Sequence, residues 1–191
     1  TLLEQLQFAL KGEQVASGSR HVDNIAPSLF GGLVLTVGID NPNVKQIPVP
    51  PTVRCVLVHP HMVLGTREAR SILSRTVDLS NVIWQTANIA GFLTGCFTGD
   101  LQLIRESLED VIIEPQRQVL IPGFPAVKQG AMSNGALGCS ISGAGPTVFA
   151  WCEQPDAERV RDAMVAGFAA QKMDSDAWIS TLDAVGARIV D

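Results

Sequence analysis

The segment from Gly138 to Phe149 reads GCSISGAGPTVF, a glycine-rich turn between two runs that favour strands. Because glycine has no Cβ and accepts positive φ, the turn at Gly143 and Gly145 presents bare backbone to which a ligand can come close. Taken alone, such a turn is more typical of a hairpin that binds nothing. Its meaning depends on the other polar groups of the chain.

A second polar cluster consists of His21, Asp23 and Asn24, which follow an expected helix break at Gly18–Ser19. In an extended loop, alternation would point His21 and Asp23 to one side and Asn24 elsewhere. Glu13 lies eight residues before His21, near the end of the expected first helix. On local features, the histidine and aspartate are typical of a loop pair that satisfies itself, and Glu13 of a solvated helix face.

Two arginines, Arg70 and Arg117, lie in or at the end of helical stretches whose neighbouring positions are apolar. A planar guanidinium group matches a carboxylate bidentately, so both are candidates for binding an anionic substrate. Thr66 could add a hydroxyl contact while it caps the helix that begins there. A solvated surface arginine is the ordinary alternative at each position.

These polar segments occur in the order and rough spacing of a known family. The blocks at 18–27, 66–70, 113–124 and 141–147 resemble those of the bacterial homoserine kinases, which belong to the GHMP group of small-molecule kinases. The resemblance runs from about residue 3 to Asp191. It implies transfer of the ATP γ-phosphoryl group to the hydroxyl of L-homoserine in threonine biosynthesis, with ATP and Mg²⁺ as cofactors.

The resemblance also implies roles for individual residues. Glu13 would ligate Mg²⁺, Asp23 would hold the substrate ammonium group, and the two arginines would clasp the substrate carboxylate. His21 and Asn24, near the substrate hydroxyl, are the candidate catalytic residues. The implied substrate-binding set is His21, Asp23, Asn24, Thr66, Arg70, Arg117 and Gly143, and the implied nucleotide-binding set is Ser142, Gly143, Ala144 and Gly145.

Two departures from the GHMP pattern shape the hypothesis. Relatives that act through a carboxylate base have Asp where this chain has Asn24, so catalysis would depend on positioning and charge stabilisation. The N-terminal Pro-x-x-x-Gly-Leu-Gly-Ser-Ser-Ala loop that wraps the nucleotide phosphates does not occur in the sequence, and neither does a Gly-x-x-x-x-Gly-Lys-Ser/Thr loop. We therefore expect a C-terminal portion of the enzyme that turns over little without the missing N-terminal portion.

Two other functions stay open at this point. One is a non-catalytic homoserine-binding or assembly module, and the other is a GHMP kinase for another small alcohol. The combination of Arg70, Arg117 and Asp23 favours an amino acid, because it offers both an anion pair and an ammonium partner.

Composition and charge bound the class of protein. The 191 residues are 46% hydrophobic and 17% charged, which is typical of a globular chain. A net charge of -5 without a Lys/Arg run argues against nucleic acid as a partner. No apolar stretch approaches the roughly 20 residues that span a bilayer, so we expect a cytoplasmic protein without a membrane partner. The resemblance implies a homodimer.

The remaining reactive or aromatic side chains are expected to be structural. The cysteines lack Cys-x-x-Cys spacing and are expected to be reduced core thiols, the tryptophans lie in apolar periodic segments, and two histidines are too few for a metal site. These residues are Cys55, Cys96, Cys139, Cys152, Trp84, Trp151, Trp178, His59 and His61.

Apolar periodicity predicts the elements that carry these residues. Helices are expected over 1–17, 66–73, 82–96 and 100–113 and after Pro155, and strands over 32–37, 53–58, 137–141, 147–152, 177–182 and 187–190, with turns after Asn24 and at 41–43. Thr1 and Glu4 have the form of a capping box. The expected buried faces are Leu2, Leu3, Leu6 and Leu10, then Leu101, Ile104, Leu108 and Val111, then Ala157, Val160, Met164 and Phe168.

With the middle helices taken as one layer, the order is strand, helices, strand, strand, helix, strand. It predicts an α+β fold in which helices cover one face of an antiparallel sheet, commonly in the ferredoxin-like arrangement. The resemblance implies the same fold for the GHMP C-terminal domain. The prolines at 48–51 are the expected boundary, so residues 1–50 would be the trailing part of the N-terminal domain and 51–191 the C-terminal domain.

Overall fold

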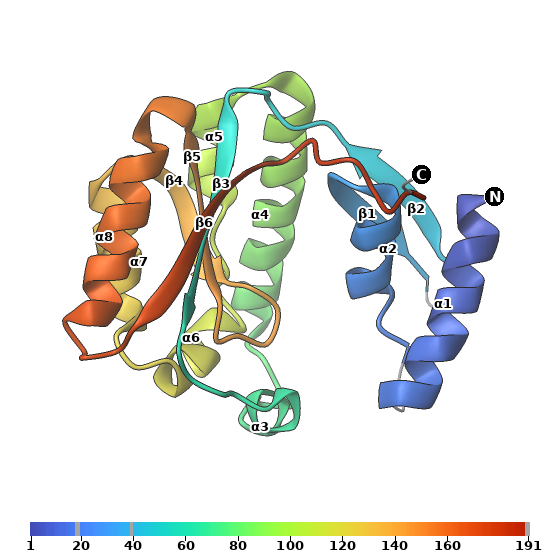
Figure 1. Ribbon diagram of the computed structural model, residues 1–191, viewed down its shortest axis with the longest axis horizontal. Coiled ribbons are helices and arrows are strands. Elements are labelled where there is room, and N and C mark those ends of the chain that lie inside the picture. The colour runs from blue at the N-terminus through green and yellow to red at the C-terminus, as the bar shows by residue number, and fades with distance from the viewer. Residues whose placement is uncertain (18–19, 39, 190–191) are drawn as a thin grey trace. The chain divides into compact units, whose positions relative to one another are not determined.

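The computed structural model describes residues 1–17, 20–38 and 40–189 (Figure 1). The chain divides into two compact units, one formed by Thr1–Val49 with Leu182–Asp191 and the other by Pro50–Thr181. The division after Val49 falls inside the proline cluster, but the residues from Leu182 onward cluster with the first unit and not, as expected, with the second. The expected break at Gly18–Ser19 lies outside the described residues.

The second unit is built on an antiparallel sheet whose strand order is β4-β5-β3-β6. The strands are β3 (Val53–Pro60), β4 (Ala136–Ile141), β5 (Val148–Glu153) and β6 (Ser175–Thr181). This order, with helices between the first and second strands and between the third and fourth, is the ferredoxin-like arrangement. The predicted α+β class is therefore confirmed, and so are all four strands of this sheet, within a few residues at their ends.

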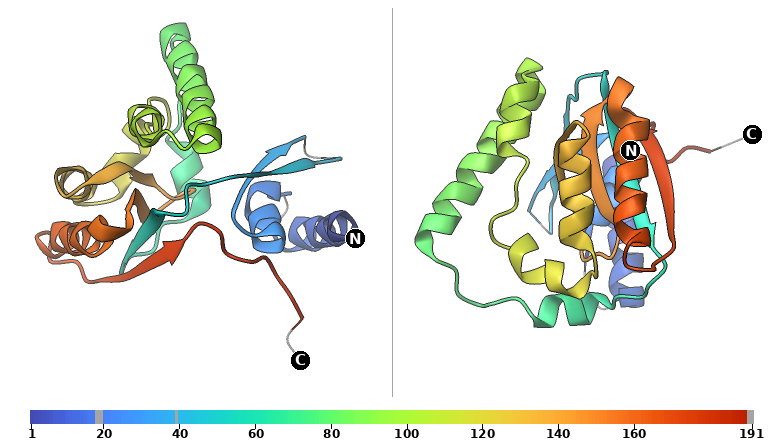
Figure 2. Two further views of the ribbon diagram at one scale, coloured as in Figure 1. Left: turned by 90° about the horizontal axis from the view of Figure 1, so that it is seen from above. Right: turned by 90° about the vertical axis from the view of Figure 1, so that its left-hand side faces the viewer.

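Helices α7 (Phe124–Ser133) and α8 (Ala157–Ala169) lie side by side over one face of this sheet (Figure 2). The four residues predicted for the inner face of α8 are all buried there. Helix α7 was not predicted, because its Gly130 lowers helix propensity. A Cβ at Gly130 would lie 3.2 Å from the Ala163 carbonyl oxygen, so the glycine permits close packing of α7 on α8.

Helices α4 (Leu79–Thr98) and α5 (Leu101–Ser107) pack on each other, and the Phe92 ring lies 5.2 Å from the ring of Trp151 on β5. Helix α5 ends at Ser107, not at Ile113 as predicted. The Asp110 carboxylate accepts hydrogen bonds from the backbone N–H groups of Ile112 and Ile113, at 2.9 and 2.7 Å. These local bonds compete with helical ones, so the chain leaves the helix before this point.

The second unit also contains the short helices α3 (Thr66–Ser71) and α6 (Glu114–Arg117) and the 3₁₀ turns η1 (Gln118–Leu120) and η2 (Gln154–Asp156). Thr66 does not cap α3 as predicted. The first helical hydrogen bond runs from the Ala69 N–H to the Gly65 carbonyl at 3.0 Å, which makes Gly65 the capping residue and Thr66 the first helical one.

The predicted core tryptophans behave differently from one another. Trp151 is buried, but Trp84 and Trp178 are each 52% exposed, so the prediction was wrong for both. Helix α4 is apolar on most of its circumference, so periodicity cannot identify its buried face, and β6 is an edge strand that pairs with β3 alone. The cysteines are free, as predicted; three are buried, Cys55 is half-buried, and burial raises the pKa of the Cys55 thiol to about 12.

In the first unit, helices α1 (Leu2–Ser17) and α2 (Val22–Phe30) pack beside a hairpin of β1 (Leu33–Val37) and β2 (Asn43–Ile47). The predicted capping box is present: the Glu4 N–H donates to Thr1 Oγ1 at 3.3 Å, and the Thr1 amino group donates to the Glu4 carboxylate at 2.7 Å. The buried cluster of this unit is Leu6, Leu10, Val22 and Ala26.

Three expectations for the first unit were wrong. Leu2 and Leu3 are exposed, because α1 buries only the positions that face α2. Asp23 and Asn24 lie in the first turn of α2 and not in a loop, since Val22 and Ala26 at i, i+4 spacing bury a helical face. Residues 187–189 form no strand; one isolated bridge joins Gly31 and Val185. The predicted turn at 41–43 connects β1 to β2, a strand that was missed.

Within the described residues, none of the helices combines the length and apolar character that crossing a bilayer requires.

Candidate active site

The glycine turn connects β4 to β5 and is closed by two backbone hydrogen bonds. The Ser142 N–H donates to the Thr147 carbonyl at 2.8 Å, and the Gly145 N–H donates to the Ser142 carbonyl at 2.9 Å. Gly143 and Gly145 both have positive φ, of 57° and 85°. A Cβ at Gly145 would also lie 3.0 Å from Ile121 Cδ1, whereas one at Gly143 would meet open space. Glycine is therefore required for conformation at both positions and for packing at one.

The turn leaves two backbone donors available to a ligand. Within the described part of the chain, the N–H groups of Gly143 and Ala144 make no hydrogen bond to other protein groups, and Gly143 is exposed. Successive N–H groups in such a turn form an anion-binding concavity. Gly145 differs from its neighbours because its N–H is already engaged, so it contributes backbone shape and no donor.

Arg117 joins the turn to helix α3. Its Nε donates to the Ala69 carbonyl at 3.1 Å, and its Nη1 donates to the Gly143 carbonyl at 2.8 Å. Ala69 precedes Arg70, and Thr66 begins the same short helix, so the predicted substrate-binding residues of this unit come from segments that one guanidinium group ties together. The structure thus gives Arg117 a positioning role that the sequence did not reveal.

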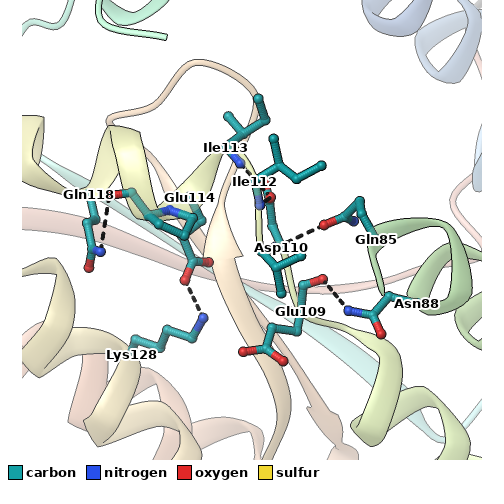
Figure 3. A network of polar contacts seen from close by, with 11 residues as sticks. Gln85, Asn88, Glu109, Asp110, Ile112, Ile113, Glu114, Gln118 and Lys128 are labelled. Atoms are coloured by element: carbon teal, nitrogen blue, oxygen red, sulfur yellow. Dashed lines mark hydrogen bonds and ion pairs between the residues drawn. The ribbon is translucent and has the colours of Figure 1, made fainter. Parts of the chain in front are cut away.

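An ion pair between a buried carboxylate and a partly exposed lysine anchors the helix that carries Arg117. The Glu114 carboxylate, at the start of α6, accepts a hydrogen bond from the Lys128 ammonium group on α7 (Figure 3). Glu114 is buried, and its Oε2 has no partner within the described residues. The neighbouring Cys139 thiol has its pKa raised to about 12, mainly by burial.

Sequence reasoning missed this ion pair. Glu114 lies inside a segment that resembles the family, but Lys128 lies on a helix that was not predicted. A lysine in an otherwise apolar helical face was the only local signal for the pairing.

The two histidines of the His-Pro-His run have separate partners. His59 Nδ1 lies 2.8 Å from Thr147 Oγ1, at the end of the glycine turn, and His61 Nε2 lies 3.0 Å from the Asp176 carboxylate. His59 thereby links β3 to the turn. Among the described residues, no three His, Cys, Asp or Glu side chains gather in a way that could hold a metal ion by themselves.

The first unit carries the other predicted residues. His21 Nδ1 lies 2.8 Å from Glu13 Oε1, which joins the end of α1 to the start of α2, and both side chains are partly buried. Asp23 and Asn24 are exposed in the first turn of α2. Glu13 offers the hard oxygen that Mg²⁺ prefers, and one carboxylate plus substrate phosphates is a common magnesium ligand set.

The two units therefore offer complementary chemistry. The second supplies guanidinium groups and free backbone donors, which bind anions, and the first supplies carboxylates, which bind cations.

Comparison with known proteins bears on this chemistry. Residues 92–170 match the family described as GHMP kinases C terminal. The chain is 43% identical over 191 residues to the homoserine kinase of Chlorobium phaeobacteroides (strain BS1), an alignment that covers 98% of this chain and 60% of the relative. It is 45% identical over 185 residues to that of Xylella fastidiosa (strain 9a5c), covering 96% and 56%.

A solved structure of a homoserine kinase is also similar to this chain. The crystal structure of homoserine kinase from Cytophaga hutchinsonii ATCC 33406 superposes with a TM-score of 0.94 at 43% identity and covers 97% of this chain and 59% of that one. The L. major mevalonate kinase shares the fold, with a TM-score of 0.68 at 19% identity. The chain spans about 60% of the length of the relatives that it matches.

Proposed function

We propose that this chain, which carries the C-terminal domain of the GHMP kinases, is the C-terminal portion of a homoserine kinase. The reaction would transfer the ATP γ-phosphoryl group to the side-chain hydroxyl of L-homoserine and yield O-phospho-L-homoserine. Residues 1–50 would then be the trailing part of the N-terminal domain. Similarity to homoserine kinases along the whole chain supports the proposal.

The observation that carries the proposal is the bridge from Arg117 to the Ala69 and Gly143 carbonyls. It fixes the spacing of a helix that presents Arg70 and a turn that presents two free N–H groups. Arg117 uses two of its N–H donors in this bridge, so we assign it both positioning and carboxylate binding, and we assign carboxylate binding to Arg70. The N–H groups of Gly143 and Ala144 would donate to phosphate oxygens.

In the first unit, Asp23 would pair with the substrate ammonium group, while His21 and Asn24 would lie near the reacting hydroxyl. An amide side chain cannot take the hydroxyl proton as a carboxylate base would, so Asn24 would orient the hydroxyl by hydrogen bonding. Glu13 is the residue that would hold Mg²⁺, and His21 would orient that carboxylate through their contact. When bound, Mg²⁺ would neutralise phosphate charge.

Calorimetry with L-homoserine, mevalonate and galactose tests the substrate class. We expect heat of binding for homoserine and none for the other two, because only homoserine carries both an ammonium group and an α-carboxylate for these residues. Equal binding of mevalonate would favour a GHMP kinase for another alcohol. No homoserine binding to a folded chain or to its full-length form would overturn the proposal.

A coupled ADP-release assay tests the catalytic part of the proposal. We expect turnover near background for the 191-residue chain, since the sequence has no loop to wrap the nucleotide phosphates, and substantial turnover for a form that includes the N-terminal portion. Removing one preorganised donor from a comparable oxyanion site costs about 10²–10³ in rate. Homoserine binding without turnover in the longer form would instead indicate a binding module.

We also propose that the whole enzyme is a cytoplasmic homodimer that binds no nucleic acid and no membrane, as expected from the resemblance and the charge. Light scattering of the full-length form tests the dimer. A concentration-independent monomer mass would contradict it.

A further inference from the structure

A cavity of about 260 Å³ lies in the second unit, between helix α4, the end of α5 with the segment that follows it, and strands β4 and β5. It is on the opposite side of the sheet from α7 and α8, because Phe149 in its wall alternates with the core residues Val148 and Ala150. None of the residues assigned above to phosphoryl transfer lines it. The cavity is therefore a separate feature that the proposed function does not use.

Three polar side chains that line the cavity are more than nine-tenths buried. Asn88 is 7% exposed, and Ser107 and Ser140 are each 8% exposed. Asn88 donates from Nδ2 to the Glu109 carbonyl at 3.1 Å (Figure 3), and its Oδ1 has no donor within the described residues. Neither serine hydroxyl makes a hydrogen bond to any described group. Among the described residues, the fully buried side-chain atoms without a partner are Glu114 Oε2 and Ser175 Oγ, so these three unpartnered atoms reach the open space of the cavity and are available to a ligand there.

The charge of the lining restricts what that partner can be. Glu109 and Asp110 are the charged residues of the lining, and within the described chain no lysine or arginine contributes to it. Carboxylates and an amide oxygen only accept hydrogen bonds, whereas an ammonium group has three donors and no acceptor. A phosphate or carboxylate ligand would meet like charge here, and a cationic ligand would meet opposite charge.

Gln85 also lines the cavity, and its Oε1 already accepts a hydrogen bond from the Val111 N–H at 2.9 Å. The rest of the lining is apolar, with Ile89 and Phe92 on α4 facing Phe149 on β5. Ligand sites commonly combine such walls with a few placed polar groups. A cavity of about 150 Å³ accommodates benzene, so 260 Å³ has room for one aromatic ring with a short chain.

We propose that this cavity binds a small primary amine with an aromatic or branched apolar body. The ammonium group is held by Asn88 Oδ1, the two serine hydroxyls and the adjacent carboxylates, and the body packs on Ile89, Phe92 and Phe149. Ile141 also lines the cavity and immediately precedes Ser142 of the glycine turn. A ligand in this cavity would therefore contact the last residue of β4, next to the proposed nucleotide-binding turn.

Calorimetry with three matched probes tests the proposal: 2-phenylethylamine, 2-phenylethanol and phenylacetate, which share a ring and differ in charge. We expect the amine to bind at least about ten-fold more tightly than the alcohol, because its hydrogen bonds are charge-assisted, and phenylacetate to bind most weakly. Phenylacetate binding as tightly as the amine would overturn the proposal. Glu109→Gln should reduce the preference for the amine over the alcohol, and an unchanged preference counts against the assigned charge.

A variant that fills the cavity provides the second arm. Ile89 is exposed as well as lining, so Ile89→Trp should fold and abolish amine binding; Leu79→Trp, on an exposed position of the same helix outside the cavity, should bind as the parent chain does. Unchanged binding to Ile89→Trp would refute the site.

Amide NMR needs no variant. We expect the amine to shift Asn88, Ser107 and Ser140, and shifts confined to other parts of the chain would also refute the site. L-Homoserine, whose carboxylate is excluded, should not cause these shifts, so this test is independent of the proposed kinase activity.

Discussion

The two units hold their predicted site residues by different means. In the second unit, the glycine turn and α3 are joined by Arg117. The helix that carries Arg117 is anchored by the ion pair of the buried Glu114 with Lys128, beside a core of many side chains. In the first unit, Asp23 and Asn24 are exposed, and His21 contacts Glu13 beside a small buried cluster. The backbone donors of the glycine turn thus belong to the unit with the larger core, and the exposed side chains of α2 belong to the unit with the smaller core.

This difference suits the chemistry that we propose. Backbone N–H groups that bind a phosphate cost no reorganisation only if the turn is preorganised, which requires a well-packed scaffold. Exposed side chains can instead adapt to a substrate and its ammonium group. Stability should therefore respond strongly to changes under the second-unit site and weakly to changes in the first unit.

The largest expected effect comes from Lys128→Met. It leaves the Glu114 carboxylate buried without its countercharge. Breaking a fully buried pair costs about 3–5 kcal/mol of unfolding free energy, and because Lys128 is partly exposed we expect a loss at the lower end of that range. Urea denaturation measures the loss. Lys45→Met, at an exposed position of the first unit, is the control and should change stability by less than about 0.5 kcal/mol.

A double variant sharpens this result. Glu114→Leu combined with Lys128→Met removes both charges, so it should recover much of the stability lost in Lys128→Met alone. A loss in the double variant as large as the sum of the two single losses would show that the pair is not the anchor of α6.

The next largest effect concerns substrate binding by the arginines. Arg70→Ala should weaken L-homoserine binding by about 10- to 150-fold, the equivalent of a charge-assisted contact of roughly 1.5–3 kcal/mol, with little change in stability. Arg117→Ala should weaken binding and also destabilise the turn, because the Ala69 and Gly143 carbonyls lose their donor. Calorimetry and amide exchange at 142–145 separate the two effects.

Controls for this prediction come from the same short helix and from conservative changes. Arg67→Ala, exposed on α3, should leave binding unchanged. Arg70→Lys and Arg117→Lys should each retain only part of the homoserine affinity, since a compact ammonium charge cannot form the two parallel hydrogen bonds of a guanidinium group. The two alanine losses should not add, with a coupling of about 0.5–3 kcal/mol. Unchanged homoserine affinity in both variants would reject the carboxylate clasp.

Much of the fold could be predicted because its signals are local. The inner face of α8 and the strands around the glycine turn follow from short-range periodicity and glycine chemistry. Helix α7 could not be predicted because Gly130 argues against a helix unless the close approach to Ala163 is known. The position of Asp23 in a helix was missed because two apolar residues, Val22 and Ala26, are compatible with an apolar turn as well as with a helix. Their packing against α1 shows that they form the buried face of a helix.

The residues of the candidate site were named from the family resemblance and stay a prediction, whereas the bonds between them could not be predicted from the sequence. The family resemblance pointed to both Arg117 and Gly143. It could not show that Arg117 donates to the Gly143 carbonyl, because the two residues lie 26 positions apart and meet only in the folded chain. Likewise, the sequence treats Gly143 and Gly145 alike, whereas only the register of the turn shows that the Gly145 N–H is already engaged. Long-range pairing, such as Glu114 with Lys128, leaves no local pattern.

Packing at helix surfaces gives a smaller effect that separates the two units. Gly167→Ala on α8 should destabilise by about 1–3 kcal/mol, because its Cβ would lie 2.8 Å from Val127 Cγ2 and 2.9 Å from Val127 Cα, so the backbone of α7 has to move. Thermal denaturation measures the change. An unaltered melting temperature would mean that α7 and α8 are not packed as described.

The smallest expected effect has the opposite sign. Gly12 lies within helix α1 of the first unit, and a Cβ there would meet no atom within 4 Å. Alanine removes the extra backbone freedom of glycine in the unfolded chain and introduces no clash, so Gly12→Ala should stabilise α1 by about 0.5–1 kcal/mol. Amide exchange along α1 measures this gain within the first unit. We expect slower amide exchange along α1 in Gly12→Ala and faster amide exchange along α7 and α8 in Gly167→Ala. This contrast follows if an added methyl group fits at Gly12 and clashes at Gly167. Faster exchange along α1 in Gly12→Ala would show that the helix packs more closely than the described surface of the first unit allows.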